Sequence, residues 1–158
     1  MKILFWNIRC LSGAGRRKQL VELCQLHGVA LICLQETIKD TFTSRELNRF
    51  SRGEYYHWFW TRPKGHSGGM LMGAPHAAAT ICNEDKGEFF QSLTIRNVDD
   101  DFEWELINVY GPMQDDKKRE FLQELVCKIH SVSLPCVVGG DFNMVRRVED
   151  KSTGQVNN

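Results

Sequence analysis

The first 35 residues carry a strand–helix–strand pattern that restricts the fold more than any other feature of the sequence. An apolar run at residues 2–6 predicts a strand, and helical periodicity over residues 16–27 stops at Gly28. A second apolar run at residues 29–34 predicts another strand. Two strands joined by a crossover helix lie parallel in one sheet, with the helix on one face. The pattern indicates the α/β class, and 158 residues correspond to a single domain over residues 1–158.

The remaining sequence continues to alternate between strands and helices. Thr43 and Glu46 stand at capping-box spacing and predict a short helix over residues 43–50. A longer helix over residues 114–130 is predicted from an apolar face, made of Phe121, Leu122, Leu125, Val126 and Ile129. Further strands are predicted over five apolar runs, at residues 55–60, 70–73, 77–82, 89–96 and 102–109.

Two of these runs are close enough in sequence to pair directly. Residues 89–96 and 102–109 flank a turn at residues 97–101 and predict an antiparallel hairpin. In the second run, Phe102, Trp104 and Leu106 alternate with polar residues, which is typical of a half-buried strand.

The segment at residues 135–143, P-C-V-V-G-G-D-F-N, combines a short apolar run with polar residues at its exit. Its β-branched run predicts a buried strand, and the two glycines allow a sharp turn and a close approach to the backbone. Asp141 and Asn143 share one side if the chain stays extended. A carboxylate and an amide placed in this way suit a metal ion or a phosphate. The same residue types also form plain turns, so both interpretations stay open.

Other predicted strands end in polar side chains as well. Asn7 follows the first strand, Glu36 follows the second, and Tyr110 follows the strand at residues 102–109. Because ligands bind at the carboxyl edge of open α/β sheets, we expect these side chains to converge with Asp141 and Asn143. Carboxylates and amides suit a hard cation such as Mg²⁺, which takes one or two protein carboxylates and completes its shell with water and substrate phosphate.

Composition limits the partners and the compartment that the sequence predicts. The chain has 20 Lys and Arg against 20 Asp and Glu, so contacts to DNA are expected to be weak or confined to local patches. The six cysteines form no C-x-x-C pair and are interpreted as reduced core residues. No apolar run resembles a signal peptide or a membrane span, which predicts an intracellular protein, nuclear or cytoplasmic, that does not bind membranes.

Five short motifs carry a resemblance to a known family. They occur in the expected order and cover nearly the whole chain: Phe5-Trp6-Asn7-Ile8-Arg9, Leu34-Gln35-Glu36-Thr37, Ser67-Gly68-Gly69, Asn108-Val109-Tyr110-Gly111-Pro112 and Gly140-Asp141-Phe142-Asn143. The sequence resembles the endonuclease/exonuclease/phosphatase superfamily. It is most similar to the apurinic-type endonuclease domain of non-LTR (LINE-like) retrotransposons, because a basic residue stands at Arg9 where the repair enzymes have an acidic one. The stretch at residues 141–151 is most similar to plant elements.

The resemblance implies a four-layer α/β sandwich of the DNase I-like type and Mg²⁺-dependent cleavage of phosphodiester bonds, with Mn²⁺ as the alternative metal. Glu36 would be the main metal ligand and Asn7 would support it. Tyr110 would contact the phosphate, Asn143 would orient the phosphate or the nucleophile, and Asp141 would activate the attacking water. The remaining substrate contacts would come from Arg9 and Ser67. In retroelements the resulting nick leaves a 3′-hydroxyl that primes reverse transcription.

The sequence also departs from the family pattern. The family domain continues with further strands and a terminal Ser-Asp-His segment, whereas 15 residues without histidine follow Asn143 here. Cys10 and Ile38 replace the usual glycine and lysine. We therefore expect a sandwich that is incomplete at the C-terminus and an impaired nuclease. The alternatives are a non-catalytic remnant that binds nucleic acid weakly, and a phosphatase or RNase branch of the same superfamily.

Overall fold

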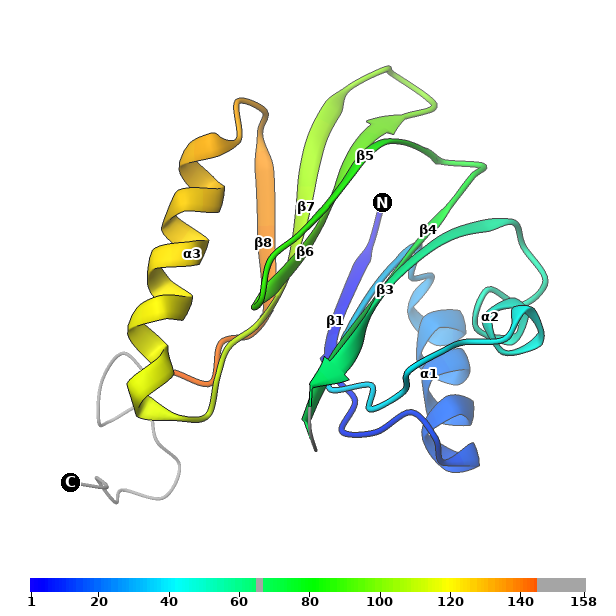
Figure 1. Cartoon of the computed structure of the whole chain (residues 1–158). Helices are drawn as coiled ribbons and strands as arrows, with labels where there is room; N and C mark the ends of the chain where they lie inside the picture. The colour runs from blue at the N-terminus through cyan, green and yellow to red at the C-terminus, as the bar shows by residue number, and fades with distance from the viewer. Residues whose placement is uncertain (65–66, 145–158) are drawn as a thin grey trace.

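Two four-stranded sheets stack face to face, with helices on both outer faces (Figure 1). The computed structural model describes residues 1–64 and 67–144. In spatial order, the first sheet contains β1 (Ile3–Asn7), β2 (Leu31–Gln35), β4 (Ser67–Pro75) and β3 (Tyr56–Lys64). The second sheet contains β5 (Ala79–Lys86), β6 (Phe90–Asn97), β7 (Glu103–Tyr110) and β8 (Cys136–Asp141).

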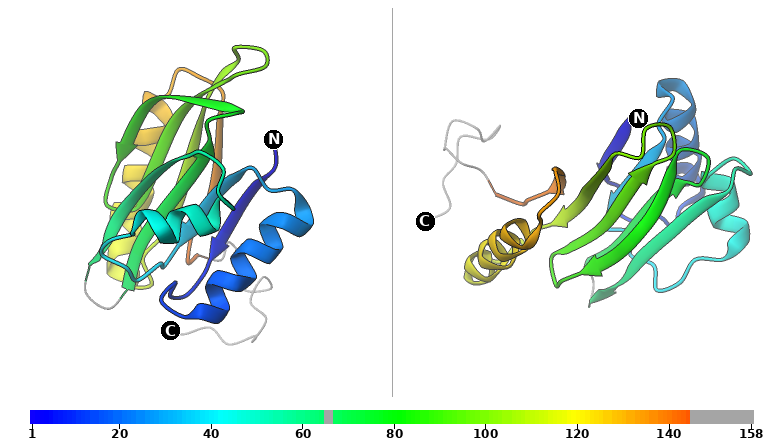
Figure 2. Two further views of the ribbon diagram at one scale, coloured as in Figure 1. Left: turned by 90° about the vertical axis from the view of Figure 1, so that its right-hand side faces the viewer. Right: turned by 90° about the horizontal axis from the view of Figure 1, so that it is seen from above.

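The helices complete a sandwich of four layers. The helices α1 (Ala14–His27) and α2 (Ser44–Phe50) cover the first sheet, and α3 (Lys118–Ser131), preceded by the 3₁₀ turn η1 (Asp115–Lys117), covers the second (Figure 2). Apolar side chains of α1 and α2 pack on β2, whereas Phe121 of α3 packs on β7. This arrangement confirms the predicted four-layer α/β fold. No helix in the described ranges is long and apolar enough to cross a lipid bilayer.

The first helical crossover pairs as the sequence predicts. β1 and β2 are parallel, with Leu4 opposite Ile32, and α1 ends at Gly28 in the left-handed conformation. A second parallel pair, β7 and β8, is joined through α3. Each sheet therefore contains a strand–helix–strand unit. The strand ends from the two units meet where Asn7 of β1 hydrogen-bonds Asp141 of β8.

Two other local predictions are also confirmed. β6 and β7 form the expected antiparallel pair. At the start of α2, the Glu46 amide donates to the Thr43 hydroxyl oxygen at 3.3 Å, and the Thr43 amide donates to the Glu46 carboxylate at 3.0 Å. A hydrogen bond from Lys39 and the backbone donor at Thr43 lower the pKa of Glu46 to about 2.

Several burial predictions are wrong, and the position of each element in the sandwich explains why. Among the strands of residues 1–144 that the structure describes, β8 lies at the edge of its sheet, and Cys136 and Val137 are exposed instead of buried. β7 lies between two strands and is covered on both faces, so it is fully buried along its centre instead of half-buried. Phe102 precedes the strand and is exposed.

The apolar face predicted for α3 is only partly covered. Phe121 is buried, whereas Leu122, Val126 and Ile129 are exposed. The predicted core role of cysteine is confirmed for Cys24 and Cys33, while exposed cysteines occur on β5, α3 and β8. β3 continues to Lys64, and residues 65–66 lie outside the described ranges.

A buried hydrogen-bonded bridge joins the two sheets near one end of the sandwich. The space between the sheets is mainly filled by apolar side chains, including Leu31, Met72 and Leu93. Toward the carboxyl ends of β2 and β7 this filling becomes polar. The Gln35 Nε2 atom donates to the Asn108 Oδ1 atom at 2.5 Å, and the Asn108 Nδ2 atom donates to the backbone oxygen of Leu34 at 3.2 Å.

We predict that Gln35→Leu lowers the free energy of unfolding by about 1–3 kcal/mol, because the buried Asn108 oxygen loses its donor. Denaturant titration measures the change. The exposed-site control Gln25→Leu should shift the free energy by less than about 0.5 kcal/mol. The double variant Gln35→Leu/Asn108→Leu should regain part of the loss. An unchanged stability of Gln35→Leu would show that the bridge does not hold the sheets together.

A buried lysine fixes α3 to the second sheet. The Lys128 Nζ atom lies 2.7 Å from Asp85 Oδ2 and 2.6 Å from Glu105 Oε1, and the side chains of Lys128 and Glu105 are both only 8% exposed. Burial acts to lower the pKa of the Lys128 ammonium, but its hydrogen bonds to Asp85 and Glu105 outweigh burial and raise it. The ammonium therefore stays charged and holds two carboxylates.

We predict that Lys128→Met destabilises the fold by about 3–5 kcal/mol at neutral pH, because the Glu105 charge stays buried without a partner. Lys18→Met removes an exposed pair with Glu22 and should cost less than about 1 kcal/mol. Thermal and denaturant unfolding of both variants measure the difference. Equal losses would contradict the assigned role of Lys128.

Candidate functional site

The polar strand ends of the two sheets meet at one edge of the sandwich. The Asn7 Nδ2 atom donates to the Asp141 Oδ2 atom at 2.6 Å, although the two residues are 134 positions apart and belong to different sheets. Asn7 closes β1 and Asp141 closes β8. The expected convergence of these two residues is confirmed, but it occurs where the ends of two sheets meet and not at the edge of one sheet.

Backbone hydrogen bonds continue past the ends of β1 and β2 and hold the two exit loops together. The amide of Ile8 donates to Gln35, the amide of Cys10 donates to Glu36, and the amide of Leu11 donates to Thr37. Arg9 has a positive φ of 48°, and its amide donates to the Asn7 Oδ1 atom at 3.1 Å. These contacts fix the orientation of the Asn7 amide, so that its NH₂ group points to Asp141.

Glu36 lies directly beyond β2 with a positive φ of 57°. The next two amides, of Thr37 and Ile38, donate to the backbone oxygens of Gly69 and Gly68. The Glu36 carboxylate is half-buried and has no hydrogen bond or ion pair with another described residue. A half-buried carboxylate with free oxygens is suited to bind a cation.

Tyr110 stands next to both carboxylates. Burial raises the pKa of its phenol above the ordinary value of 10.0, and the negative charges of Glu36 and Asp141 raise it further. The phenol is therefore protonated at neutral pH and available as a hydrogen-bond donor to an anionic substrate.

Asn143 reaches the site by a turn and not along an extended strand. β8 ends at Asp141, and Asn143 has a positive φ of 48°. The Asn143 amide donates to Asp141 Oδ1 at 3.0 Å, and its side-chain Nδ2 donates to the backbone oxygen of Gly111 at 2.8 Å. The expected common side of an extended strand is thus replaced by a turn in which the Asn143 backbone amide binds the Asp141 carboxylate.

Glycines allow the close approach of the chain in this turn. Gly140 has φ 139°, and a Cβ atom there would lie 2.0 Å from the backbone oxygen of Val109. At Gly111 a Cβ atom would lie 2.2 Å from the backbone oxygen of Phe142. A side chain at Gly140 would push β8 away from β7, and a side chain at Gly111 would push away Phe142 in the turn after β8.

The structure describes the two remaining predicted substrate contacts, Arg9 and Ser67, to different extents. Arg9 is exposed at the rim of the site, next to Asn7 in sequence, and its side chain is free of ion pairs with the described residues. Ser67 begins β4, but its side chain lies outside the part that the structure describes. Both roles stay predictions.

The donor set fits a hard divalent cation that keeps several waters. In the described part of the chain, no group of three or more His, Cys, Asp or Glu side chains is placed to hold a metal. The site offers instead two carboxylates, Glu36 and Asp141, together with the amide of Asn7. Mg²⁺ is usually bound by one or two protein carboxylates plus water and substrate phosphate, which agrees with this set.

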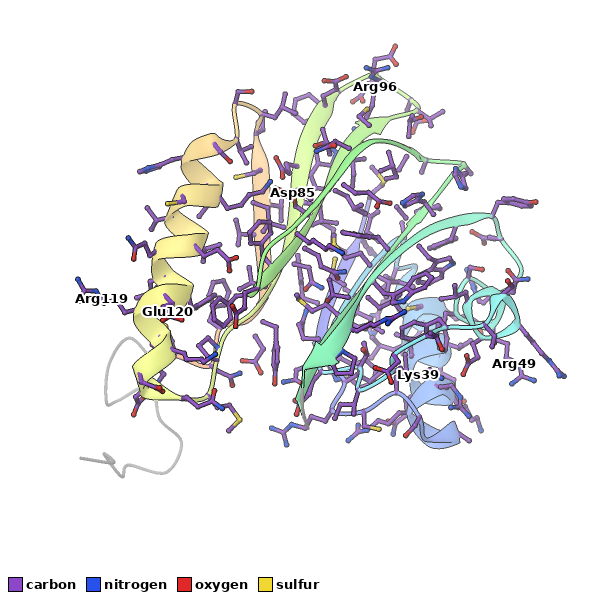
Figure 3. All side chains as sticks on the ribbon, in the orientation of Figure 1. Lys39, Arg49, Asp85, Arg96, Arg119 and Glu120 are labelled. Carbon is purple, nitrogen blue, oxygen red and sulfur yellow. The ribbon has the colours of Figure 1, made fainter. Side chains whose placement is uncertain are left out.

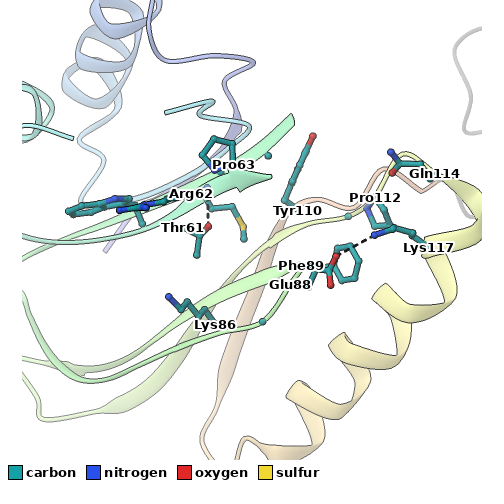
Figure 4. A pocket seen from close by; sticks show the side chains of 16 residues that line it. Thr61, Arg62, Pro63, Lys86, Glu88, Phe89, Tyr110, Pro112, Gln114 and Lys117 are labelled. Carbon is teal, nitrogen blue, oxygen red and sulfur yellow. Dashed lines mark hydrogen bonds and ion pairs between the residues drawn. The ribbon is translucent and has the colours of Figure 1, made fainter. Parts of the chain in front are cut away.

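The sequence did not predict the cleft that opens beside Tyr110 between the two sheets (Figure 4). Its volume is about 690 Å³, and β3, β4 and β5 contribute Thr61, Met70 and Lys86 to its wall. The period-two pattern of each strand could have assigned these side chains to a face, but only the stacking of the sheets brings them together.

We predict that the Tyr110 phenol titrates above pH 10.0, and that Glu36→Gln or Asp141→Asn moves the titration toward 10.0 by removing a neighbouring charge. Ultraviolet difference spectra against Tyr110→Phe isolate this phenol. The folded state should lose stability as the pH rises from 10.0 through the higher folded value, because the unfolded chain releases this proton first. Titration at 10.0 in all three proteins would contradict the placement of Tyr110 beside the carboxylates.

Solved structures with this arrangement of sheets and helices come from several kinds of protein. TDP2 of D. rerio, humanized by 14 mutations, is 16% identical with a TM-score of 0.69, and the match covers 91% of this chain and 66% of that one. A mannosyl-6-phosphatase of Bacteroides thetaiotaomicron is 15% identical with a TM-score of 0.67, covering 89% and 64%. The human Nocturnin catalytic domain, solved with a bound sulfate anion, is 16% identical with a TM-score of 0.62, covering 90% and 64%.

These three likenesses show a shared fold, and this chain spans less than two thirds of the length of each of them. No curated protein sequence matches the chain significantly. The sequence model of the Endonuclease/Exonuclease/phosphatase family matches residues 4–152, a stretch that includes every residue of the site described above. By this match and by its fold, the chain belongs to the Endonuclease/Exonuclease/phosphatase family.

Proposed function

We propose that this chain is a Mg²⁺-dependent phosphodiesterase that nicks DNA, of the kind carried by non-LTR retrotransposons. The observation that carries the proposal is the hydrogen bond between Asn7 and Asp141, which joins the ends of two strands from different sheets. Glu36 and Tyr110 lie beside it. The retroelement assignment rests on the sequence motifs, above all on the basic residue at Arg9.

Glu36 and Asn7 would hold the metal in this proposal. The half-buried Glu36 carboxylate supplies the negative charge, and the amide oxygen of Asn7 supplies a neutral ligand. A Mg²⁺ ion held there would supply Lewis acidity toward the phosphoryl oxygen and positive charge for the leaving oxygen.

Asp141 would act as the general base. Its Oδ2 atom accepts a hydrogen bond from the Asn7 side chain, and its Oδ1 atom accepts one from the Asn143 backbone amide. Each oxygen keeps a free lone pair. The carboxylate takes a proton from the attacking water as the new P–O bond forms. The bond to the leaving oxygen breaks, and that oxygen takes up a proton from solvent.

Tyr110 and Asn143 would stabilise the phosphate while its charge increases. The protonated phenol of Tyr110 donates toward a phosphate oxygen. The side-chain NH₂ group of Asn143 donates one hydrogen to the backbone oxygen of Gly111. This bond fixes the side chain and leaves the second hydrogen of the NH₂ group for the substrate. Arg9 and Ser67 would add contacts to the phosphates on either side.

We expect nicking of supercoiled plasmid with Mg²⁺ and none with EDTA. Glu36→Ala and Asp141→Asn should slow nicking by about 100-fold or more, since each removes a group that acts in the transition state. The matched control Glu22→Ala removes an exposed carboxylate on α1 and should nick at the parent rate. The sequence predicts an impaired nuclease, so we also expect the parent protein to nick plasmid slowly.

Three results would reject parts of this proposal. Nicking that persists in EDTA would exclude the metal, and nicking by Glu36→Ala at the parent rate would exclude the assigned ligand. Intact plasmid combined with hydrolysis of a soluble phosphate ester would favour the phosphatase branch of the family. A folded protein that cleaves neither substrate would favour a non-catalytic remnant.

A further inference from the structure

The cleft beside Tyr110 lies outside the proposed catalytic residues, apart from Tyr110 itself. Its volume of about 690 Å³ is within the usual range of about 300–1,000 Å³ for small-ligand sites. One wall comes from the first sheet, with Thr61, Pro63 and Met70, and the opposite wall comes from β5 and β7, with Lys86 and Tyr110 (Figure 4).

Strand register explains why the walls face each other. Lys86 pairs with Gln91, and Gln91 pairs with Asn108, whose side chain points between the sheets to Gln35. Paired residues share a face of the sheet, so Lys86 and Gln91 also point between the sheets. In the first sheet, Gln35 pairs with Met70, which places the Met70 side chain in the same space.

The strand that pairs with Lys86 carries unused hydrogen-bonding capacity. Gln91 is fully buried, and neither atom of its amide has a hydrogen-bond partner among the described residues. Buried amides are almost always paired with protein, water or ligand. Gln91 pairs with Lys86 in register and is not among the residues that line the cleft.

The positive charges of the cleft are available to a ligand. Lys86 forms no ion pair with the described residues. Lys117 lies at the other end of the cleft. Its Nζ atom is 3.5 Å from Glu88 Oε1, and both side chains are more than 40% exposed. An ion pair this open contributes little, so a phosphate can compete for the Lys117 ammonium.

The combination of apolar walls and cations selects a class of ligand. Pro63, Met70 and the ring of Tyr110 offer flat or adaptable apolar contacts, and Lys86 and Lys117 offer charge for phosphates. A nucleotide has both a flat base and a phosphate, whereas a phosphorylated sugar lacks the flat apolar part. Because the cleft lies between two sheets, a base can enter it only when it is unpaired and unstacked.

We propose that this cleft binds one unpaired nucleotide of the substrate strand, next to the phosphate that is cleaved. The inference rests on the proposed function, because it places the cleaved phosphate at Tyr110. The base lies between the Met70 wall and the Tyr110 wall, and Lys86 and Lys117 bind the backbone phosphates on either side.

Binding can be measured without cleavage, by fluorescence anisotropy of a labelled single-stranded oligonucleotide in EDTA. We expect Lys86→Ala/Lys117→Ala to weaken binding about tenfold and to reduce the slope of log K against log salt by about 1.4, or 0.7 for each lost phosphate contact. The control Arg45→Ala/Arg49→Ala removes the same charge from the outer face of α2, where Arg49 points into solvent (Figure 3). It should bind within about twofold of the parent.

Equal weakening in both double variants would overturn the inference, because only the overall charge would then matter. A blunt duplex that binds as tightly as the single strand would overturn the requirement for an unpaired base. Inorganic phosphate and a mononucleotide can be compared as competitors of the oligonucleotide. If both displace it equally well, the cleft binds phosphate alone, and this result would also overturn the inference.

The plasmid assay separates this inference from the proposed function. If Glu36→Ala abolishes nicking while Lys86→Ala/Lys117→Ala binds and nicks like the parent, the cleft assignment fails and the catalytic proposal stands. If oligonucleotide binding depends on Lys86 and Lys117 but no protein nicks, the cleft assignment as a nucleotide site stands and the catalytic proposal fails.

Discussion

The hydrogen bond between Asn7 and Asp141 is the contact on which the site depends, because it joins the ends of two edge strands that belong to different sheets. Gln35 lies opposite Asn7 in the β1–β2 pair and bonds Asn108 across the same space. The two polar contacts fix how far apart the sheets lie at this end of the sandwich. Glu36 and Tyr110 then take positions set by the strands to which they belong.

The space between the sheets changes character along the strands. Apolar residues fill most of it, while Gln35, Gln91 and Asn108 occupy the end beneath the site. Polar groups are costly to bury unless they are paired, and the Gln35–Asn108 bridge meets this condition. Gln91 does not meet it within the described residues, and it pairs with Lys86, which lines the cleft. The molecule thus accepts a cost in stability beside the region that we assign to the substrate.

The second sheet ends in a strand whose apolar side chains are not fully covered. Val137 on β8 is 40% exposed, and Leu122 and Val126 on the adjoining helix α3 are 44% and 50% exposed. Within residues 1–64 and 67–144, β8 forms an edge of the second sheet, and these apolar side chains lie uncovered beside it. Exposed edges of this kind pair readily with other chains, so purified protein should be handled at low concentration in the assays above.

Local sequence patterns were sufficient for much of the fold. The parallel β1–β2 pair, the capping box at Thr43 and the left-handed stop at Gly28 each follow from a few neighbouring residues. Burial was harder to predict, because an apolar run such as β8 looks the same at a sheet edge as in a sheet centre. Its neighbours in space, which are far away in sequence, decide whether it is covered.

The sequence by itself determined which residue types stand at the strand ends, and with them the polar site at the carboxyl edge. Parallel strands joined by helices bring their ends to one edge whatever the details of packing. The tertiary structure alone decided that Asn7 bonds Asp141, that Asn143 arrives through a turn, and that Lys86 faces Met70 across a cleft. These contacts depend on the stacking of two sheets, and that stacking is set by side chains whose positions no local period encodes.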